Sequence, residues 1–456
     1  MFIKAFYLFG LSYHEIILIV KQNVDFFKFT QMLFYGKILE LDSRSKSGMT
    51  KEMFEKIPTK NRIFLGAFVA MSIILTLLVI SKINKDAQKI IEEQKKIQDE
   101  AEFEIIELKY DKMMEAREAS LPIEPLFNPP PPPDIERMKR EGCIVDGLLN
   151  GYNKGTESAI KLVNRSNCYY LHRAIETWLE PPDFEEIEKT MAKIKKEDVV
   201  YGMFIAEAID TKADYRYEYR NRDFDFSKMC RSGSKNDWGE HTCKPILSKK
   251  EYQRYVKYIT RKAMDLGVQS FMFGQIYYQD YISDPSVKEV IDSMRSYANL
   301  RGLEIVIGAQ TNDIEDEKYL KQFDFIEGGV GINSEGKIEE GSCFSRWYKK
   351  PGDWCWALLW HERFSSKAKN VFVHLDWSGI KGDDMSIFAN MSREKRAETL
   401  RYLDNYFEKT DVGFLMPMIA VLHKENGGCY GRTKRYYSAD NKYSCKDEDV
   451  INKLLK

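Results

Sequence analysis

The stretch Asp324–Ile332, DFIEGGVGI, decides the fold class, because from Phe325 onward it is apolar on both faces around one charged residue, Glu327. A strand that is buried on both faces belongs to a parallel sheet whose two sides are covered. Six further stretches share this character: Cys143–Leu149, Val199–Ile209, Val268–Tyr278, Leu303–Gln310, Asn370–Trp377 and Val412–Leu422. The sequence therefore predicts a parallel sheet of at least these strands.

Segments with the apolar spacing of amphipathic helices separate the strands. They are Glu157–Leu179, Phe184–Lys196, Lys249–Leu266, Ser286–Leu300, Asp316–Phe323, Trp354–Lys367 and Arg393–Lys409. This alternation predicts an α/β fold, a (β/α)8 TIM-like barrel, with Tyr436–Ser438 as the candidate eighth strand. An open doubly wound sheet is the alternative, and it ranks second because the chain has no GxGxxG or GxxxxGK[ST] loop.

Ahead of the strands, Ile63–Ile80, IFLGAFVAMSIILTLLVI, contains no charged residue and predicts a single transmembrane helix. At roughly 1.5 Å per residue the stretch crosses about 27 Å of hydrocarbon. Ser81–Asn84 offers no small-residue cleavage site, so we expect an uncleaved signal-anchor that binds the lipid bilayer. A buried helix of a soluble protein is the alternative, but such helices rarely run this long without a polar residue.

The residues before the anchor predict a short cytoplasmic head, residues 1–62. Met49 begins MTKEMFEKIPTKNR, a natural head for an anchor by itself. Residues 1–48 are aromatic and apolar but are broken by charged residues, so they are no second span. Two readings follow: residues 1–48 belong to the native head, or they are upstream sequence that precedes the true start.

Between the anchor and the strands lie a predicted stalk and a linker. Residues 81–120 are charged, and from Lys82 they lack Gly and Pro, which predicts a helical stalk. Gln94 and Glu104 interrupt the apolar seam of this helix, so it supports at most a weak homodimer. Residues 121–133, LPIEPLFNPPPPP, predict a stiff polyproline II linker. Residues 134–456 remain for one large barrel domain.

All eight cysteines follow the anchor and form close pairs along the chain: Cys143 and Cys168, Cys230 and Cys243, Cys343 and Cys355, Cys429 and Cys445. They lack CxxC and Cys/His zinc spacings, so we expect disulfide bonds formed in an oxidising compartment. Free buried thiols in a cytosolic domain are the alternative. Basic residues are balanced on the two sides of the anchor, so the cysteines decide the topology. They predict a single-pass protein of the cell membrane, with a cytoplasmic amino end and an extracytoplasmic carboxyl domain.

Composition excludes one class of partner. The chain has 69 basic and 70 acidic residues, and no basic block is interleaved with aromatic residues, so we expect no nucleic-acid binding. Aromatic residues make up 13% of the chain, which fits a carbohydrate surface and fits an ordinary core nearly as well.

Polar side chains gather where the predicted strands end, which is where a barrel builds its active site. Three carboxylates are the candidate catalytic residues: Glu207, Glu327 and Asp376. The candidate substrate-binding residues are Gln275, Tyr277, Tyr278, Asp280, Gln310, Asp313, His374 and Trp377. Two carboxyl groups supply acid and nucleophile or base, amides bind hydroxyl groups, and aromatic faces stack on sugar rings.

Each catalytic candidate has a structural alternative. Glu207 stands in an apolar strand, where burial without a purpose is costly, and Glu327 precedes two glycines that leave room for a ligand. Asp376 is an equally good helix cap or arginine partner. His374 and Asp376 alternate onto one strand face, but the further histidines of a metallohydrolase barrel are missing. We therefore expect neither a metal nor another cofactor.

Four strand ends in order, FIAEAID, FGQIYYQD, FIEGG and FVHLDWSG, resemble the glycoside-hydrolase-like barrels that bacteria carry as envelope proteins. The resemblance covers about residues 143–425 and matches no named family, since neither an Asn-Glu-Pro nor a DxxDxDxE motif is present. It implies a membrane-anchored glycosidase that acts on a cell-envelope or extracellular polysaccharide by carboxylate acid/base catalysis. A carbohydrate-binding barrel without activity is the alternative, and a purely structural envelope protein is a third hypothesis.

Overall fold

The computed structural model describes residues 123–150, 156–311, 314–339, 367–376, 383–422, 436–442 and 444–455, with scattered positions between 71 and 113. The chain divides into two units, Met1–Asp111 and Lys112–Lys456. In the first unit, residues 88–98 are helical and exposed. Apart from Met71 and Ile74, the predicted transmembrane stretch lies outside the described residues. Within the part of the chain that is described, no helix has the length and apolar character that crossing a membrane requires.

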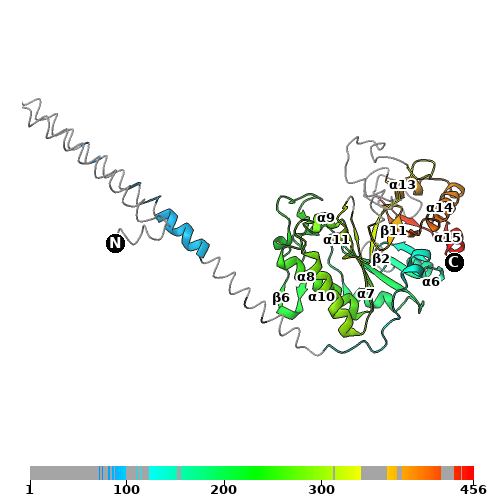
Figure 1. Ribbon diagram of the computed structural model, residues 1–456, viewed down its shortest axis with the longest axis horizontal. Coiled ribbons are helices and arrows are strands. Elements are labelled where there is room, and N and C mark those ends of the chain that lie inside the picture. Colours follow the sequence, from blue (N-terminus) through cyan, green and yellow to red (C-terminus); the bar gives the residue numbers. More distant parts are fainter. Residues whose placement is uncertain are drawn as a thin grey trace, which may run out of the picture. The chain divides into compact units, whose positions relative to one another are not determined.

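The second unit is built on parallel strands that form a barrel (Figure 1). Neighbouring strands follow the order of the chain, as in a repeated βα unit. The strands of the ring are β1 (Gly142–Val145), β2 (Tyr170–Glu176), β3 (Val200–Ile205), β8 (Ser270–Phe273), β9 (Val306–Gln310), β10 (Phe325–Gly329), β11 (Val371–His374), β12 (Gly413–Phe414) and β13 (Met416–Val421).

The ring closes through its last strand. β12 pairs with β11 and β13 pairs with β1, both in parallel, and only Leu415 separates β12 from β13. The Leu415 N–H also donates to the carbonyl of Val373 at 2.8 Å, so the chain passes from one neighbour to the other without a break. The predicted barrel of parallel strands is thereby confirmed. The prediction for Tyr436–Ser438 was wrong: this segment is strand β14, which pairs antiparallel with β13 outside the ring.

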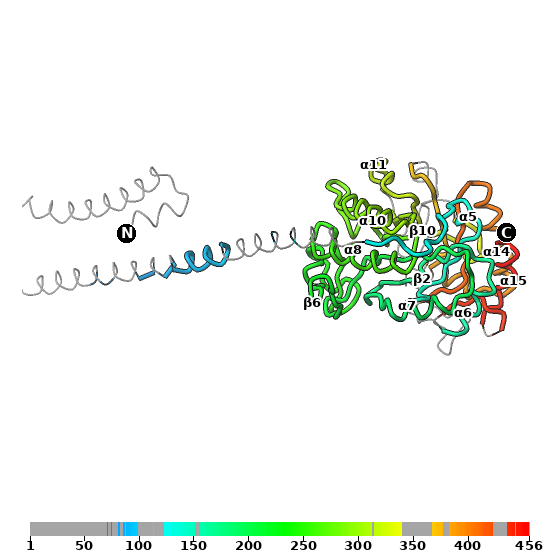
Figure 2. The backbone as a smooth tube through the Cα atoms, turned by 90° about the horizontal axis from the view of Figure 1, so that it is seen from below, coloured from blue at the N-terminus to red at the C-terminus, as the bar shows by residue number. Residues whose placement is uncertain are grey.

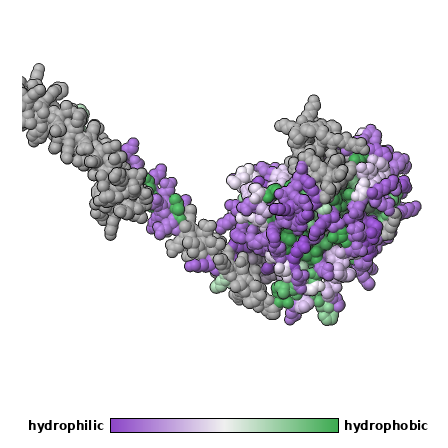
Figure 3. Space-filling model, in the orientation of Figure 1, coloured by the Kyte–Doolittle hydropathy of each residue, from purple (hydrophilic) through white to green (hydrophobic). Residues whose placement is uncertain are grey.

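Helices cover the outside of the ring (Figure 2). They are α5 (Ile135–Arg140), α6 (Glu157–Arg165), α7 (Phe184–Met191), α8 (Lys250–Asp265), α9 (Ile276–Gln279), α10 (Val287–Arg301), α11 (Glu317–Leu320), α13 (Asp384–Ala389), α14 (Arg393–Glu408) and α15 (Glu448–Leu454). Their apolar faces and the outward side chains of the strands form the larger core. Hydrophilic residues cover most of the visible face of the barrel domain (Figure 3).

One predicted helix, Glu157–Leu179, was wrong in its second half. The helix ends at Arg165, and the chain returns as strand β2. Ser166 is extended, and its hydroxyl donates to the Val163 carbonyl, a local bond that competes with continuation of a helix. Cys168 then forms a disulfide with Cys143 of β1, which fixes the start of β2 beside that strand. The missing eighth strand of the sequence prediction is therefore β2.

A compact apolar plug fills the end of the ring opposite to the carboxyl ends of the strands. Its buried side chains come from the inward positions of the strands: Ile144, Tyr170, Val200, Phe204, Met272, Val306, Phe325, Phe372 and Leu415, with Met138 of α5. Glycines make room for the rings: a Cβ atom at Gly308 would lie 2.1 Å from the ring of Phe325. The plug closes one end of the barrel and leaves the carboxyl ends of the strands for polar groups.

The longest insertion, between β3 and α8, carries short elements of its own. They are β4 (Ile209–Asp210), β5 (Arg216–Tyr217), η1 (Glu218–Arg220), β6 (Arg222–Asp223), η2 (Phe226–Met229) and β7 (Thr242–Cys243). The predicted Cys230–Cys243 disulfide closes this insertion and is confirmed, as is Cys143–Cys168. Cys445 is also disulfide-bonded. Cys343, Cys355 and Cys429 lie outside the described residues.

The proline-rich linker lies against the barrel where the strands begin. The Leu126 N–H donates to the Arg301 carbonyl at 2.9 Å, and the Gln269 side-chain amide donates to the Pro131 carbonyl at 2.8 Å. Arg301 ends α10 and Gln269 immediately precedes β8. From residue 123 the linker is therefore attached to the domain instead of standing free of it.

Candidate active site

The strand period brings three polar side chains into the barrel directly above the apolar plug. Tyr170, Phe325 and Phe372 point inward, so the residues two positions later, His172, Glu327 and His374, point inward as well. All three of these polar residues are buried. They come from β2, β10 and β11 and meet on the barrel axis.

Glu327 is the centre of this layer and has no exposed surface. Its Oε2 atom lies 2.6 Å from Nε2 of His172, and its Oε1 atom lies 3.1 Å from Nδ1 of His374. The Gln310 side-chain amide donates to Oε1 at 3.5 Å. A buried carboxylate is costly unless it is paired, and a histidine nitrogen lies within 3.1 Å of each of its oxygens here.

The contacts assign different proton states to the two histidines. His172 Nδ1 lies 2.6 Å from the hydroxyl of Tyr170, which can donate to it, while Nε2 faces the carboxylate and must carry the proton. A neutral ring satisfies both partners. Both nitrogens of His374 face carboxylates, because Nε2 lies 3.4 Å from Oδ1 of Asp376. Carboxylates accept only, so His374 is an imidazolium.

Electrostatics supports the same assignment. Burial opposes ionisation of Glu327, but the facing histidines outweigh it and hold the pKa of this carboxyl well below its usual range. Burial lowers the pKa of His172. Burial also disfavours a charge on His374, but Glu327 and Asp376 outweigh it and raise the pKa of this imidazole to about 10. An anion and a cation therefore lie next to each other inside the barrel at neutral pH.

A second charged group lies beside this layer, in the middle of β2. Arg173 adopts a left-handed backbone, φ 55°, where the β2–β3 register shifts. Its guanidinium contacts Asp146 at 3.2 Å and Glu176 at 2.7 Å, and it lies 4.1 Å from the centre of the Phe204 ring. Strained backbone of this kind persists where surrounding contacts determine it and clusters at functional sites.

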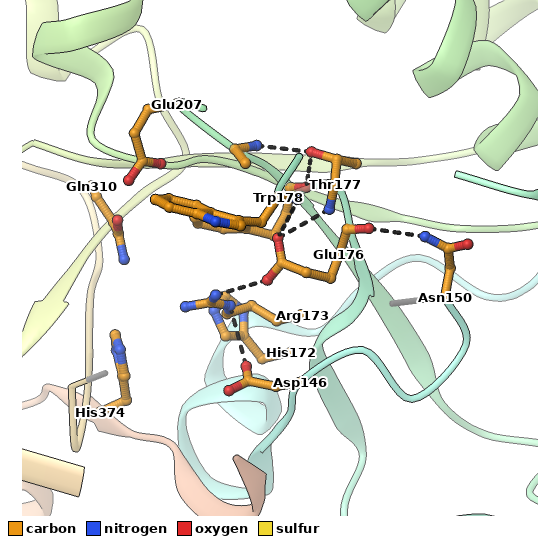
Figure 4. A network of polar contacts seen from close by, with 12 residues as sticks. Asp146, Asn150, His172, Arg173, Glu176, Thr177, Trp178, Glu207, Gln310 and His374 are labelled. Carbon is orange, nitrogen blue, oxygen red and sulfur yellow. Dashed lines mark hydrogen bonds and ion pairs between the residues drawn. The ribbon is translucent and has the colours of Figure 1, made fainter. Parts of the chain in front are cut away.

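Glu207 follows β3 and lies near Trp178 and Gln310 (Figure 4). The Gln275 amide donates to its Oε1 atom at 2.6 Å, and the Tyr277 hydroxyl donates to Oε1 of Gln275 at 2.5 Å. Its Oε2 atom is buried and has no hydrogen-bond partner among the described residues. Burial raises the pKa of Glu207 to about 7. Glu207 is therefore mostly protonated below about pH 7. One of its two oxygens has no hydrogen-bond partner among the described residues.

Amide side chains join Glu207 to the central layer. The Gln275 backbone N–H donates to Oε1 of Gln310 at 3.3 Å, and Gln310 donates to Glu327. The three predicted carboxylates, Glu207, Glu327 and Asp376, thus belong to one network, in which Asp376 joins through His374. Asp376 is the most exposed of the three at 6%, against 2% for Glu207 and 0% for Glu327.

Aromatic residues lie around Glu207. Trp178 follows β2 and packs against the barrel interior, and its ring is 5.2 Å from that of Trp238 in the insertion. Trp238 in turn lies 6.5 Å from Tyr278, which contacts Tyr277 at 4.3 Å between ring centres. The Cys230–Cys243 disulfide encloses Trp238, so the insertion brings this ring to the mouth.

The sequence predictions are thus accounted for as follows. Gln275, Tyr277, Gln310 and His374 join the network, and Tyr278 joins the aromatic group. Asp280 lies apart: it accepts from the Ser286 and Val287 N–H groups and from the Tyr319 hydroxyl, and so holds the start of α10. Asp313 and Trp377 lie outside the described residues. Among the described residues, no group of three or more His, Cys, Asp or Glu is arranged to hold a metal ion.

Sequence reasoning missed five residues of the site: Asp146, His172, Arg173, Glu176 and Trp178. Four of them were missed because Glu157–Leu179, which contains β2, was predicted to be one helix. The fifth, Asp146, lies just past the end of β1. The Ser166–Asn167 pair was the available signal, because both residue types favour helix ends and turns over helix interiors.

The titration of Glu207 gives a test of this geometry. A folded-state pKa of about 7 exceeds the ordinary value of 4.5, so Glu207 stabilises the fold below pH 4.5 and this contribution is lost as the pH rises to about 7. We expect Glu207→Gln, which stays neutral, to remove roughly 3 kcal/mol of that pH dependence. Urea unfolding between pH 4 and 8 measures it. Parallel curves for the two proteins would show that Glu207 titrates normally.

No family model and no curated protein matches the chain. Similar solved structures include a GH113 β-mannanase from Alicyclobacillus acidocaldarius, with TM-score 0.41 and 11% identity over 69% of this chain and 96% of that one. A GH27 β-L-arabinopyranosidase from Geobacillus stearothermophilus gives 0.38 and 8% over 70% and 78%, and a Thermus thermophilus α-galactosidase gives 0.40 and 11% over 72% and 63%. Scores this low transfer no substrate or residue role to this chain. These solved structures are glycoside hydrolases, and no specific family is identified for this chain.

Proposed function

We propose that the barrel hydrolyses a glycosidic bond, with Glu207 as the proton donor. One observation carries the proposal: the Oε2 atom of Glu207 is buried and has no hydrogen-bond partner among the described residues, while burial raises the pKa of this carboxyl to about 7. A leaving-group oxygen at this position would receive the proton that no protein group binds. A raised carboxyl pKa in a water-poor site is what a general acid needs at neutral pH.

Asp376 is the partner carboxylate in this proposal. It lies at the carboxyl end of β11, and it is the most exposed of the three acids. Burial raises its pKa, while the hydrogen bond and charge of His374 oppose that shift. Glu327 keeps His374 charged, and His374 favours the ionised form of Asp376. Glu327 is therefore a positioning residue: both of its oxygens face histidines, so it acts through them.

The remaining residues of the mouth bind the sugar. Gln275 fixes the carboxyl group of Glu207 through one oxygen and leaves the other without a hydrogen-bond partner among the described residues. Trp178, Tyr277 and Tyr278 offer ring faces and a hydroxyl group, a combination that suits pyranose rings. We propose a cell-envelope or extracellular polysaccharide as the substrate class, in line with the predicted location of the domain.

Reducing-end release from a panel of envelope polysaccharides tests the assignment. Glu207→Gln and Asp376→Asn are expected to lower the rate by roughly 10²–10⁴-fold at every pH. For the wild type we expect the rate to fall above about pH 7, where Glu207 loses its proton. Without the charge of Glu327, the pKa of His374 is expected to fall below its present value of about 10. Glu327→Gln is therefore expected to retain activity at acid pH and to lose it at the lower pH where His374 now deprotonates.

Glu185→Gln on α7 is the matched control, since it makes the same chemical change at an exposed position on an outer helix. Circular dichroism and melting temperatures show whether each variant folds. Full activity of a folded Glu207→Gln would refute the role of the proton donor.

Carbohydrate binding without hydrolysis is the second candidate function. The observation that favours it is the low exposure of all three acids, none above 6%. If the barrel binds carbohydrate without hydrolysing it, we expect no glycan of the panel to release reducing ends. At least one glycan is then expected to be retained on immobilised protein.

We further propose that Ile63–Ile80 anchors the chain in a membrane with the barrel on the extracytoplasmic side. The uncharged stretch and the disulfides Cys143–Cys168 and Cys230–Cys243 support it. Intact cells that express the chain are expected to lose the barrel domain to added protease and to retain the protein in the membrane after alkaline extraction. A barrel protected from external protease would reverse the topology.

A further inference from the structure

A cavity of about 320 Å³ lies outside the barrel, between α8, α10 and the insertion. Its size falls at the lower end of small-ligand sites, roughly 300–1,000 Å³. It shares no residue with the network around Glu207 and Glu327. Its lining is made by Ile123, Tyr217, Tyr219, Arg220, Lys250, Gln253, Arg254, Lys257, Tyr258, Arg261, Ser293, Ser296, Tyr297 and Leu300.

One wall of this groove is a row of cations. Lys250, Arg254, Lys257 and Arg261 follow one another on α8 at spacings of four, three and four residues, which places them on one helix face. Arg220 of η1 adds a fifth cation and is 9% exposed. No described residue that lines the groove carries a carboxylate.

The part of the opposite wall that lines the groove carries no charge. α10 contributes Ser293, Ser296, Tyr297 and Leu300, spaced to share a face and all uncharged. The one acid of α10 that contacts the α8 lysines, Glu289, lies outside this lining. The groove therefore offers hydrogen-bond donors and positive charge to whatever enters it.

Two of the carboxylates that contact these cations, Glu289 and Glu251, are each shared between two basic residues. Glu289 lies 3.3 Å from Lys250 and 3.0 Å from Lys257, so one acid serves two lysines. Glu251 contacts Arg254 at 3.1 Å and also Arg222 at 2.6 Å. The side chains of Arg254 and Lys257 are 12% and 20% exposed, so this positive charge is largely shielded from solvent. An anionic ligand would lower the cost of holding these cations together.

We propose that this groove binds an acidic polysaccharide, by contacts between its carboxylate or sulfate groups and the cations of α8 and η1. The polar lining favours a glycan, since serine, glutamine and tyrosine supply partners for hydroxyl groups. The residues that line the groove are not part of the network around Glu207. The groove is therefore a second site, and glycan binding there does not depend on hydrolysis by Glu207. A bilayer surface is the competing ligand, and the experiment separates the two.

Binding is measured on the full chain in detergent micelles by isothermal titration calorimetry. The probes are polygalacturonate and dextran sulfate, with methyl-esterified polygalacturonate and dextran as their neutral counterparts. We expect at least one acidic probe to bind and its neutral counterpart not to bind. Lys250→Gln with Lys257→Gln is expected to weaken that binding roughly tenfold or more, because charge-assisted contacts are lost. Lys250→Arg with Lys257→Arg is expected to retain it.

The matched control is Lys288→Gln with Lys321→Gln, which removes the same charge from exposed positions outside the groove. Equal weakening by this pair would show non-specific attraction and overturn the proposal. So would the absence of binding to both acidic probes, or tighter binding of anionic phosphatidylglycerol vesicles with the same dependence on Lys250 and Lys257. Glu207→Gln is expected to leave binding in the groove unchanged, which separates this site from the proposed catalytic one.

Discussion

The structure depends on one buried charge, the carboxylate of Glu327 on the barrel axis. Its desolvation would cost several kcal/mol if it stood alone. His172 and His374 reach it from β2 and β11, and their positions require that the inward registers of these strands match that of β10. The apolar plug fills the space beneath, so water cannot replace a histidine from below. The polar layer thus specifies how the strands of the ring are aligned.

From this charge the rest of the site follows in steps. An ionised Glu327 keeps His374 protonated, and a protonated His374 faces Asp376. The Gln310 and Gln275 amides carry the hydrogen-bonded chain to Glu207, whose pKa burial raises to about 7. Burial also raises the pKa of Asp376, but the hydrogen bond and charge of His374 oppose that shift, so the histidine distinguishes the two acids. The cationic groove of α8 lies outside this network and is a separate property of the helical layer.

The sequence predicted the barrel from its apolar strands, and it predicted the three carboxylates from their place at strand ends. It failed at β2, whose inward residues His172, Arg173 and Glu176 break the apolar pattern and resemble the polar face of a helix. The departure from the expected pattern coincides with the site, as is common where function competes with local rules. Proton states were beyond the sequence, because they depend on distances between side chains of β2, β10 and β11 that no spacing along the chain gives.

Nitrogen-15 NMR of the histidine side chains tests the central charge most directly. The chain contains six histidines, so His172→Gln and His374→Gln variants assign the two signals of interest. We expect His374 to be doubly protonated at pH 7 and to titrate near pH 10, and His172 to be neutral with its proton on Nε2. A neutral His374 at pH 7 would contradict the central charge, because Glu327 would then lack the cation that keeps it ionised.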